Sequence, residues 1–496
     1  MKEDSPETVH EYFKDLRKAF YTDKTHDIKW RRKQLGQIIL AFEEMKEEIS
    51  VALEKDLGRD HFISLYQEIT AIPNRAKEDS ANLEYYMKPE KRDTPVLLAP
   101  AKSRMVYQPL GAVCIYGAWN YPFVTTFSPL ICAVAAGNCA LVKPSEMAPH
   151  SSAVMRTIVE KYLDNECFKV AEGGAEVSIA CSQMQWDKIC FTGSPQKGSL
   201  VAQAAAKNLV PCLLELGGKC TTIVDEDANA QFAGFKVMSS RLANSGQICT
   251  SPDYVLIHES KKDEFIESAK ATIKDSYGED PQKDVFYSRM INEFHTERVF
   301  KLCSGHGGKV VTGGKCDIKD RYMEPTIIEN PSLDSEIMKE EIFGPILPVV
   351  TFKDFQEVID HMHEREKPLA MYYFGSVFGE HKKILEERVQ AGGMVVNDCV
   401  IHALNNRLAF GGVGQSGQGR YLGIDGFRNF SNQKAVLVKP TINIDSVNKM
   451  IMPPFTEEEK AKLMNMLTMP YYQSHAQKLL LAIALVLTIL TYLFVL

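Results

Sequence analysis

The chain has 496 residues, of which 45% are hydrophobic and 24% are charged. This composition excludes a disordered tail or a small disulfide-stapled domain, and the length allows about three domains, each able to bury its own core. Lys and Arg total 57 against 64 Asp and Glu, for a formal net charge of −7, and the basic residues form no block. We therefore expect no nucleic-acid partner.

The N-terminal region carries helical periodicity. Its first segment, MKEDSPETVHEYFKDLRK, is too charged for a secretory signal peptide. The following KWRRKQLGQIILAFEEMKEEISVALEKDL places apolar residues at spacings of three and four with charges between them, which is the period of an amphipathic helix. We expect residues 1–94 to form a packed helical layer.

The 12 cysteines are scattered along the chain without a Cys-x-x-Cys pair or an accompanying His-x-His cluster. This spacing disfavours a structural zinc or iron–sulfur site, so we predict no metal. With no signal peptide, the bulk of the chain should lie in a reducing compartment, where most cysteines are free thiols that act as small core residues.

After residue 95 the pattern changes to short apolar runs bounded by turns: GAVCIYGAW, NCALVKPS, DKICFTGS, PCLLELGG, TTIVDED, YVLIHE, GPILPVVTF and GGMVVND. Helix-like stretches such as SAVMRTIVEKYL and KGSLVAQAAAKN lie between several of them. Alternating strands and helices predict an α/β fold with parallel sheets, which bind ligands at the carboxyl ends of their strands.

Several predicted strands end in polar or turn-forming residues. Asn120 follows the strand GAVCIYGA, and an amide there can donate to an oxyanion. Lys143 and Glu146 follow the next strand, at a spacing that suits paired ribose hydroxyls. Gly193 and Ser194 join a third strand to a helix, whose free N–H groups can hold a phosphate.

A formal G-x-G-x-x-G sequence occurs at residues 412–417. It lies late in the chain, follows LAF rather than a clear strand, and opens no obvious helix. A dinucleotide fingerprint needs both the strand and the helix, so we interpret this segment as a glycine loop.

Two further residues are candidates for covalent chemistry. Glu215 stands in the apolar strand PCLLELGG, where a carboxylate is either paired structurally or raised in pKa toward that of a general base. Cys249 follows the turn-forming segment LANSGQI, and a nucleophilic thiol needs such a loop to be reachable and to meet N–H donors. Residue type alone does not select Cys249 among 12 cysteines; the combination with Glu215 and Asn120 does.

The C-terminal region differs from the rest. A capping box at Thr456 predicts a helix over 455–469, which is either an ordinary surface helix or one placed at a membrane or over the active-site mouth. Residues 479–496, LLLAIALVLTILTYLFVL, contain no charge and would span about 27 Å as a helix. We expect a transmembrane anchor rather than a core helix, inserted tail first, with the preceding chain in the cytosol and the thin endoplasmic reticulum bilayer as its membrane.

The motifs WNYP, KPSE, FTGS, LELGGK, NSGQICTSPDY, EEIFGP, VND and FGGVGQSG occur in this order. Together they closely resemble the aldehyde dehydrogenase superfamily, over nearly the whole chain from about residue 10 to 440. The PSE, SPDY and FGGVGQSG forms and the apolar tail look most like the membrane-anchored fatty aldehyde dehydrogenases of class 3.

The resemblance implies roles for individual residues. By it Cys249 is the nucleophile, Glu215 the general base and Asn120 the oxyanion holder. The cofactor NAD is held by Trp119, Lys143, Glu146, Gly193, Ser194, Gly198 and, at the nicotinamide ribose, Glu341. NADP is an open alternative, although Glu146 should repel its 2′-phosphate.

The resemblance also implies a domain plan. Residues 1–94 and 111–215 make a Rossmann-like NAD-binding domain and residues 216–429 an α/β catalytic domain. Strands within 95–110 and 430–445 form a small extension that pairs with a second subunit, giving a homodimer. The reaction is NAD(P)+-dependent oxidation of a medium- to long-chain aliphatic aldehyde to the acid, through a cysteine thiohemiacetal and thioester.

Other classes and two departures remain beside this interpretation. A CoA-acylating dehydrogenase would not need Glu215, a non-catalytic membrane scaffold would not need Cys249, and a zinc alcohol dehydrogenase would need metal ligands.

The family usually has Ser-Pro where this chain has Cys220-Thr221, and Pro195 stands where Thr or Glu is commoner. These departures concern local loop geometry and one side-chain contact.

Overall fold

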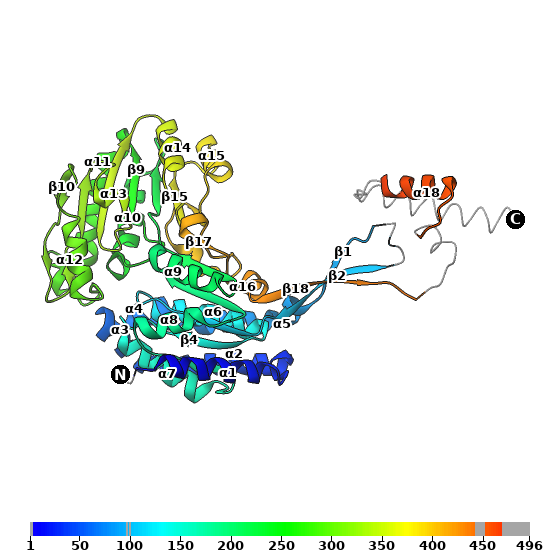
Figure 1. Ribbon diagram of the computed structural model, residues 1–496. Helices are drawn as coiled ribbons and strands as arrows, with labels where there is room; N and C mark the ends of the chain where they lie inside the picture. The colour runs from blue at the N-terminus through cyan, green and yellow to red at the C-terminus, as the bar shows by residue number, and fades with distance from the viewer. Residues whose placement is uncertain (1–2, 96–97, 99–100, 442–451, 469–496) are drawn as a thin grey trace. The chain divides into compact units, whose positions relative to one another are not determined.

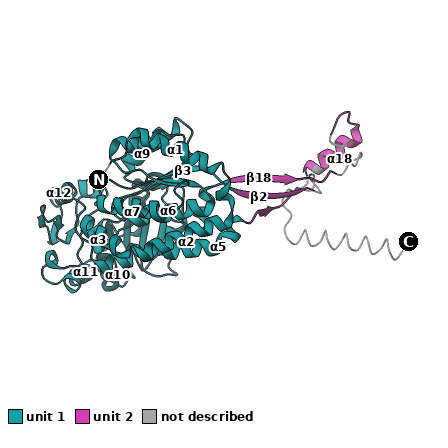
Figure 2. Ribbon diagram, turned by 90° about the horizontal axis from the view of Figure 1, so that it is seen from below, with its two compact units in different colours: residues 1–87, 108–432 teal, residues 88–107, 433–496 magenta. Residues whose placement is uncertain are grey.

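The computed structural model describes residues 3–468 except 96–97, 99–100 and 442–451. It divides into two compact units, one of residues 1–87 and 108–432 and the other of 88–107 and 433–496 (Figure 2). No helix within the described residues is both long and apolar enough to cross a bilayer. The predicted anchor at 479–496 lies outside the described residues.

The first unit begins with the expected helical layer (Figure 1). Ser5 caps the first helix by accepting the N–H of Thr8 at 3.3 Å, and Pro6 occupies its first turn. The layer consists of α1 (Pro6–Phe20), η1 (Lys24–His26), α2 (Ile28–Glu44), α3 (Lys46–Leu57), α4 (His61–Ser64), the π-helix η2 (Leu65–Ile69) and α5 (Ala71–Met87).

A sheet of strand order β17-β7-β6-β3-β4-β5 follows this layer in the chain. Its parallel strands are β3 (Ala112–Tyr116), β4 (Cys139–Lys143), β5 (Phe168–Val170), β6 (Lys188–Gly193) and β7 (Cys212–Leu216). Numbered along the chain, their spatial order is that of a Rossmann sheet, with the reversal between β3 and β6. The expected α/β fold with a Rossmann-like parallel sheet is confirmed.

The helices between these strands are α6 (Pro122–Ala136), α7 (Pro149–Tyr162), α8 (Ala175–Gln183) and α9 (Pro195–Ala206). Every described side chain of α6 except that of Val124 is buried. A helix buried on all sides lies in the interior, and α6 packs against α2 and α5 and against β3 and β4 of the first sheet.

The second sheet has the order β10-β13-β14-β9-β8-β15-β16. All of its pairs are parallel except β10 with β13. Its strands are β8 (Thr221–Val224), β9 (Tyr254–His258), β10 (Lys309–Thr312), β13 (Thr326–Glu329), β14 (Ile346–Phe352), β15 (Ala370–Phe374) and β16 (Gly393–Val396). A short hairpin of β11 (Cys316–Asp317) and β12 (Tyr322–Met323) lies between β10 and β13 in the sequence.

Two apolar cores lie on opposite faces of the second sheet. Along β15, Ala370, Tyr372 and Phe374 belong to one core, whereas Met371 and Tyr373 belong to the other, as the alternation of a strand requires. The helices of this part are α10 (Ala230–Leu242), η4 (Ala243–Gly246), η5 (Glu259–Lys261), α11 (Lys262–Tyr277), η6 (Pro281–Lys283), α12 (Glu293–Lys301), α13 (Glu336–Lys339), α14 (Phe355–Glu364), α15 (Glu380–Arg388) and η7 (Ile401–Leu404).

The glycine segment at 412–417 opens no α-helix. It forms the 3-10 turn η8 (Gly414–Ser416) and enters β17 (Gly417–Gln418), which pairs antiparallel with β7. The interpretation as a glycine loop rather than a dinucleotide fingerprint is confirmed. Residues 417–429, grouped above with the catalytic domain, thus return to the first sheet, where α16 (Gly423–Asn429) contacts α5 and α6.

The second unit contains a sheet of order β1-β2-β18, made of β1 (Glu90–Arg92), β2 (Lys102–Pro109) and β18 (Ser431–Val438). Strand β1 falls inside the region expected to be helical, because Pro89 ends α5 by disfavouring helix at the residue before it. The predicted capping box is present in α18 (Glu457–Thr468). Thr456 accepts the N–H of Glu459 at 3.2 Å, and its own N–H donates to the Glu459 carboxylate at 2.8 Å.

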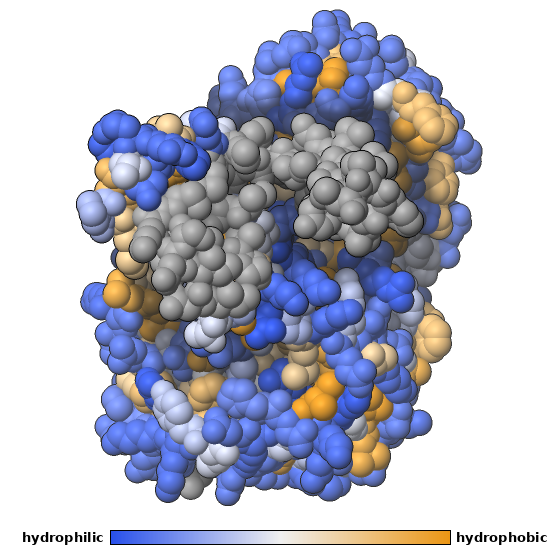
Figure 3. Space-filling model, turned by 90° about the vertical axis from the view of Figure 1, so that its right-hand side faces the viewer, coloured by the Kyte–Doolittle hydropathy of each residue, from blue (hydrophilic) through white to orange (hydrophobic). Residues whose placement is uncertain are grey.

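The face seen in Figure 3 is mostly hydrophilic among the described residues, and its hydrophobic residues form small separate groups. The large apolar side chains of the first unit are instead concentrated in the layers described above.

Candidate active site

The carboxyl ends of β3, β4 and β6 bring several predicted residues to one edge of the first sheet. Trp119 and Asn120 follow β3, Lys143 ends β4, and Gly193 ends β6. The edge includes the point where the strand order reverses, which is where open α/β sheets hold their ligands.

Lys143 and Glu146 form an ion pair at the end of β4. The Lys143 ammonium is buried and lies 2.6 Å from a Glu146 oxygen. Partial burial works against ionisation of Glu146, but the charge of Lys143, its hydrogen bond and a backbone N–H together hold the pKa of Glu146 below its ordinary value. Lys197, in the first turn of α9, acts in the same direction. A carboxylate and an ammonium therefore stand together beside the start of α9.

The turn into α9 is built as the sequence predicted. Ser194 is the N-cap of α9, with its hydroxyl accepting the N–H of Lys197 at 3.4 Å. A Cβ at Gly198 would lie 2.5 Å from a methyl carbon of Leu216, so glycine lets α9 approach β7. The first N–H groups of α9 have no partner within the helix and offer a positive helix end to an anion.

The Trp119 ring lies between two aromatic residues of the second half of the chain. Its centroid is 5.3 Å from that of His295 and 5.1 Å from that of Phe343. Burial lowers the pKa of His295 to about 4, and the Arg298 charge adds to this. His295 is thus a neutral ring at physiological pH and packs as an aromatic wall for Trp119.

The loop before Cys249 has an unusual backbone. Asn244, Ser245 and Gly246 follow one another at φ of 52°, 52° and 74°. A Cβ at Gly246 would lie 2.2 Å from the Gly344 carbonyl oxygen, so only glycine fits against the EEIFGP segment. Residues 244–248 and 250–253 are buried, whereas Cys249 between them is partly exposed. The loop therefore presents this one side chain.

Asn120 is bonded directly to this loop. Its side-chain Nδ2 donates to the Gln247 carbonyl at 3.0 Å, and the Asn244 Nδ2 donates to the Asn120 carbonyl at 3.0 Å. Gln247 in turn donates to the carbonyls of Asn244 (2.9 Å) and Arg289 (3.0 Å). An amide has two N–H groups on Nδ2, so Asn120 keeps one for a ligand.

Glu215 lies near the end of β7 and is buried. Neither of its carboxyl oxygens has a hydrogen-bond partner among the described residues. Burial raises the pKa of Glu215 well above its ordinary value, and the charge of Arg420 opposes this shift. An unpartnered carboxyl group with a raised pKa is available to accept a proton.

Two acidic residues, Glu215 and Glu341, affect the pKa of the Cys249 thiol. Burial raises the pKa of Cys249 to about 12, and the carboxyl groups of Glu341 and Glu215 contribute, while the backbone N–H groups of Cys249 and Thr250 oppose them. Cys220, where this chain departs from the family pattern, lies with its sulfur 3.2 Å from the Cys249 carbonyl oxygen. Glu215 and Glu341 are thus each within electrostatic reach of Cys249.

Glu341 follows α13 and fits against the two glycines after β7. A Cβ at Gly217 would lie 2.0 Å from a Glu341 carboxyl oxygen. Burial and the neighbouring Asp253 raise the pKa of Glu341 to about 8, against the Gly218 N–H, Arg241 and Lys219. The absent side chain of Gly217 is therefore what makes room for this carboxyl group.

Asp253 joins three of the motifs. Its carboxylate receives the Ile342 N–H at 3.1 Å and Arg241 Nη1 at 3.3 Å, and it pairs with the Lys219 ammonium. Lys219 also donates to the carbonyls of Ile337 (2.7 Å) and Glu340 (2.9 Å). This cluster fastens the segments that carry Glu215, Cys249 and Glu341 to one another.

Sequence reasoning left several of these residues without a role. Asp253 and Lys219 lay inside recognised motifs, and their charge in apolar surroundings was the available signal. Gln247 lay two residues from Cys249 in the same motif. Arg59 and Glu68, which contact the Asn120 segment, lie in the N-terminal helical layer and carried no signal.

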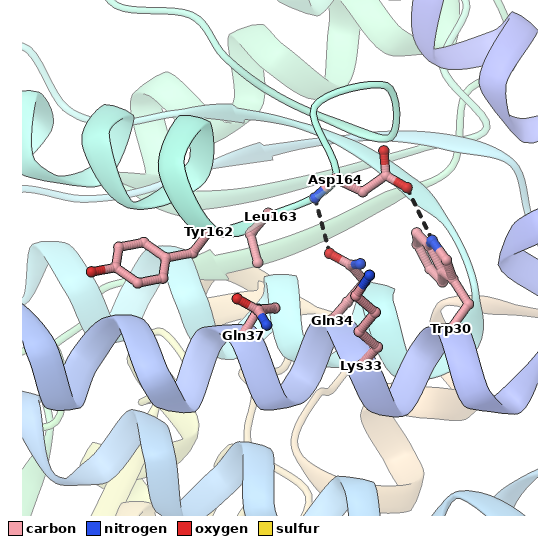
Figure 4. A pocket seen from close by; sticks show the side chains of 7 residues that line it. All are labelled: Trp30, Lys33, Gln34, Gln37, Tyr162, Leu163 and Asp164. Carbon is pink, nitrogen blue, oxygen red and sulfur yellow. Dashed lines mark hydrogen bonds between the residues drawn. The ribbon is translucent and has the colours of Figure 1, made fainter.

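A cavity elsewhere holds none of the predicted residues (Figure 4). It has a volume of about 330 Å³ and lies between α2 and the end of α7, lined by Trp30, Lys33, Gln34, Gln37, Tyr162, Leu163 and Asp164. Asp164 closes it by accepting Trp30 Nε1 at 3.0 Å and donating its N–H to Gln34 at 3.0 Å. In the described part of the chain, no three His, Cys, Asp or Glu side chains are grouped as metal ligands.

The donor set suits a dinucleotide. The free N–H groups at the start of α9 and the Lys143 ammonium can receive a diphosphate, and the Glu146 and Glu341 carboxyl groups can accept ribose hydroxyls. The indole of Trp119 offers an apolar face near Asn120. These groups come from both halves of the first unit.

Comparisons with known proteins agree with this set. Residues 1–436 match the aldehyde dehydrogenase family. The chain is 38% identical over 447 residues to 4,4'-diaponeurosporen-aldehyde dehydrogenase of Staphylococcus aureus, covering 90% of this chain and 96% of the relative. It is 36% identical over 455 residues to the dimeric NADP-preferring aldehyde dehydrogenase of Rattus norvegicus, covering 90% and 98%.

A solved structure described as the substrate-bound state of Staphylococcus aureus AldH is also similar. Its TM-score is 0.88 at 36% sequence identity, and the match covers 92% of this chain and 99% of that one. The likeness extends over both sheets of the first unit.

Proposed function

Because the chain belongs to the aldehyde dehydrogenase family, we propose that Cys249, Glu215 and Asn120 carry out its NAD(P)+-dependent oxidation of an aldehyde to a carboxylic acid. The observation that supports this most is the bonding of Asn120 to the loop that presents Cys249. These bonds join an amide to the loop that carries the one partly exposed thiol of a buried segment.

In the first step the Cys249 sulfur adds to the aldehyde carbon and forms a thiohemiacetal. At a pKa of about 12 the thiol is protonated near neutral pH, so its proton passes to a water molecule as the sulfur–carbon bond forms. The free N–H of the Asn120 amide and the Cys249 backbone N–H stabilise the oxyanion. The aldehyde carbon can then lose hydride, which the planar carbonyl could not.

NAD or NADP supplies the acceptor for that hydride. We assign its diphosphate to the start of α9 and Lys143, one ribose to Glu146, and the nicotinamide ribose to Glu341. Trp119 would flank the nicotinamide side of this site. These residues would bind and orient the cofactor, which supplies the hydride acceptor. The covalent and proton-transfer steps are proposed for Cys249, Asn120 and Glu215.

In the last step Glu215 takes a proton from water, which attacks the thioester. Its oxygens have no competing partner in the described part of the chain, and its raised pKa makes it a stronger base than an exposed carboxylate. The acid is released and the Cys249 thiol is restored. Balanced over the cycle, one aldehyde and one water give the acid and one released proton, with one hydride passed to the cofactor.

The test is to follow NADH formation by the purified protein with an aldehyde, with and without CoA. Steady turnover without CoA and release of free acid support hydrolysis by Glu215. Turnover only with CoA would support acyl transfer to CoA, and no turnover with either would support a non-catalytic scaffold.

We further propose a medium- to long-chain aliphatic aldehyde as substrate, delivered from a membrane to which residues 479–496 anchor the chain. Each buried CH₂ adds about 0.8 kcal/mol to membrane partitioning, so long-chain aldehydes are concentrated there. The expected location is the cytosolic face of the endoplasmic reticulum. One relative is named 4,4'-diaponeurosporen-aldehyde dehydrogenase.

Truncation after Gln473 tests this delivery. The truncated enzyme should keep its activity on short, water-soluble aldehydes and lose efficiency on long-chain aldehydes presented in vesicles. Unchanged turnover of the vesicle-bound substrate, or carbonate-resistant membrane binding of the truncated chain, would contradict the anchor's role.

We also propose a homodimer in which the sheet containing β18 pairs with a second copy. The strand is at the edge of its sheet, and most of its side chains are exposed, which leaves backbone groups open to another strand. A related protein carries the word dimeric in its name. Sedimentation of the full chain in detergent, with and without a proline in β18, would show whether the strand holds two copies together.

A further inference from the structure

A buried ion pair lies next to the Asn120 segment. Arg59, between α3 and α4, pairs with Glu68 in η2, and both side chains are fully buried. Neither residue belongs to a recognised motif, and both come from the N-terminal helical layer. The pair is therefore separate from the residues assigned above.

Both members of the pair hold the segment that carries Asn120. Arg59 Nη2 donates to the Asn120 carbonyl at 2.8 Å, and its guanidinium carbon lies 4.6 Å from the centroid of the Tyr121 ring. Glu68 accepts the N–H groups of Phe123 (2.9 Å) and Val124 (3.0 Å). These are the first-turn amides of α6, where a carboxylate is favoured.

The backbone of η2 supports the same contact. It is a single π-helical turn, Leu65–Ile69, a form found often at functional sites. From this turn Glu68 reaches the start of α6, and Gln67 accepts the Tyr121 hydroxyl proton at 2.9 Å. Of two successive side chains in one irregular turn, Gln67 therefore contacts the WNYP motif and Glu68 contacts the two residues that follow it.

Stability alone does not account for this pair. Two buried charges cost more desolvation than an apolar pair of the same size, and breaking the pair costs still more. Here Arg59 Nε is also buried without a partner among the described residues, which adds a penalty. The buried pair therefore carries an unfavourable desolvation free energy, and its direct contacts are to Asn120 and the residues that follow it.

From these contacts we infer that Arg59 and Glu68 are positioning residues for Asn120, holding its amide where the oxyanion forms. The inference rests on the proposed role of Asn120 in the reaction. An oxyanion donor must lie within about 2.7–3.1 Å of the oxygen, and a displacement of about 1 Å can cost about 100-fold in rate. The Arg59 contact fixes one side of the Asn120 peptide while Asn244 fixes it from the nucleophile loop.

The test is a double-mutant cycle read by the rate of the first NADH-forming turnover. One arm is Asn120→Ala, and the other is the combined change Arg59→Met with Glu68→Gln. The combined change removes both charges, and the Gln carbonyl can still accept the N–H groups at the start of α6. Arg59→Lys keeps the charge and is run in the same cycle, so that a poorly folding combined variant does not end the test.

The combined variant should slow the first turnover by about 10- to 100-fold while its NAD affinity, measured by calorimetry, stays within twofold of wild type. In the Asn120→Ala background the same change should cost less than about twofold, because the group it positions is gone. Arg59→Lys should recover part of the loss. Arg156→Met with Glu172→Gln, at another ion pair, is the matched control and should leave this rate unchanged.

Two results would overturn the inference in distinguishable ways. The first result is that the rate losses from Asn120→Ala and from the combined ion-pair change multiply when both are present. Multiplying losses from Asn120→Ala and Arg59→Lys would have the same meaning. In either case the pair supports the fold and not Asn120. If Asn120→Ala by itself leaves the rate unchanged, the proposed oxyanion role of Asn120 fails, and the inference fails with it.

Discussion

The side-chain amide of Asn120 donates a hydrogen bond to the main-chain carbonyl of Gln247 at 3.0 Å. Asn120 ends the turn after β3 in the first sheet, and Gln247 lies two residues before Cys249 in the loop that precedes β9 of the second sheet. The bond therefore ties the proposed oxyanion donor to the segment that presents the nucleophile. A fixed distance between these groups is what acyl-transfer chemistry requires.

Replacing Cys249 by Ala should abolish aldehyde oxidation and leave cofactor binding intact, because only the atom that forms the covalent bond is lost. We expect turnover to fall by about 10⁴-fold or more, with NAD affinity by calorimetry within twofold of wild type. Cys316→Ala, at a half-buried thiol in β11, is the control and should turn over normally. A wild-type rate in Cys249→Ala would contradict the assignment of Cys249 as the nucleophile and make Cys220 the candidate.

A methyl group at Gly217 should weaken NAD binding. The new Cβ would lie 2.0 Å from a Glu341 oxygen, so Glu341 must leave the position from which it is proposed to meet the ribose. With a pKa of about 8 the Glu341 carboxyl group is mostly uncharged at neutral pH, and loss of a neutral hydrogen bond costs about 0.5–1.5 kcal/mol, or about 2- to 10-fold in affinity. Calorimetric titration of Gly217→Ala with NAD measures this.

The matched control is Gly36→Ala, because a Cβ at Gly36 in α2 meets no described atom within 4 Å. It should bind NAD as wild type does. Equal NAD affinity in Gly217→Ala and Gly36→Ala would remove Glu341 from the cofactor site.

Asp79 should make the protein less stable as the pH rises. Burial raises the pKa of Asp79 to about 7, assisted by Glu78 and opposed by the Tyr86 hydroxyl and Arg75. Between about pH 4 and 7 the unfolded chain releases this proton while the folded chain keeps it, so the free energy of unfolding falls through that window. Since each pH unit of the window contributes about 1.4 kcal/mol, the loss is at most about 4 kcal/mol.

Urea unfolding of Asp79→Asn at pH 5 and pH 8 checks this sign. The amide oxygen can still accept from Tyr86, so the variant should gain stability over wild type at pH 8 and less at pH 5. Asp275→Asn, at an exposed position, should show no such difference. A gap between Asp79→Asn and wild type that is the same at both pH values would contradict the assignment.

The sequence was enough for the fold class and for the residues at strand ends. The short apolar runs and intervening helices predicted parallel sheets, and polar residues after β3, β4 and β6 marked one edge because side chains that follow parallel strands meet there. The Ser194 cap and the Thr456 capping box were predicted from local chemistry alone and are both present. These features depend on neighbours in the sequence.

Contacts between distant segments could not be predicted in this way. Nothing in the spacing of Arg59 and Glu68 indicates that they meet Asn120, because their side chains are brought there by the π-helical turn and the packing of the helical layer. The return of β17 to pair with β7 was missed for the same reason. The pairing depends on backbone register, which short glycine-rich strands specify weakly.

Glu215 is proposed to act in one step of the reaction, the hydrolysis of the thioester. The proposal rests on its unpartnered oxygens and raised pKa, and it expects the thioester to form without Glu215. Glu215→Gln keeps the size of the side chain and removes the base. The variant should therefore pass through acylation once and stop.

Intact-protein mass spectrometry of Glu215→Gln, mixed with an aldehyde and NAD, tests the mechanism most directly. We predict one NADH per active site, followed by a stall with the mass of the acyl group added to the chain and lost again on Cys249→Ala. Absence of both the burst and the adduct would mean that Glu215 acts earlier, in deprotonating Cys249, and would contradict the division of roles proposed here.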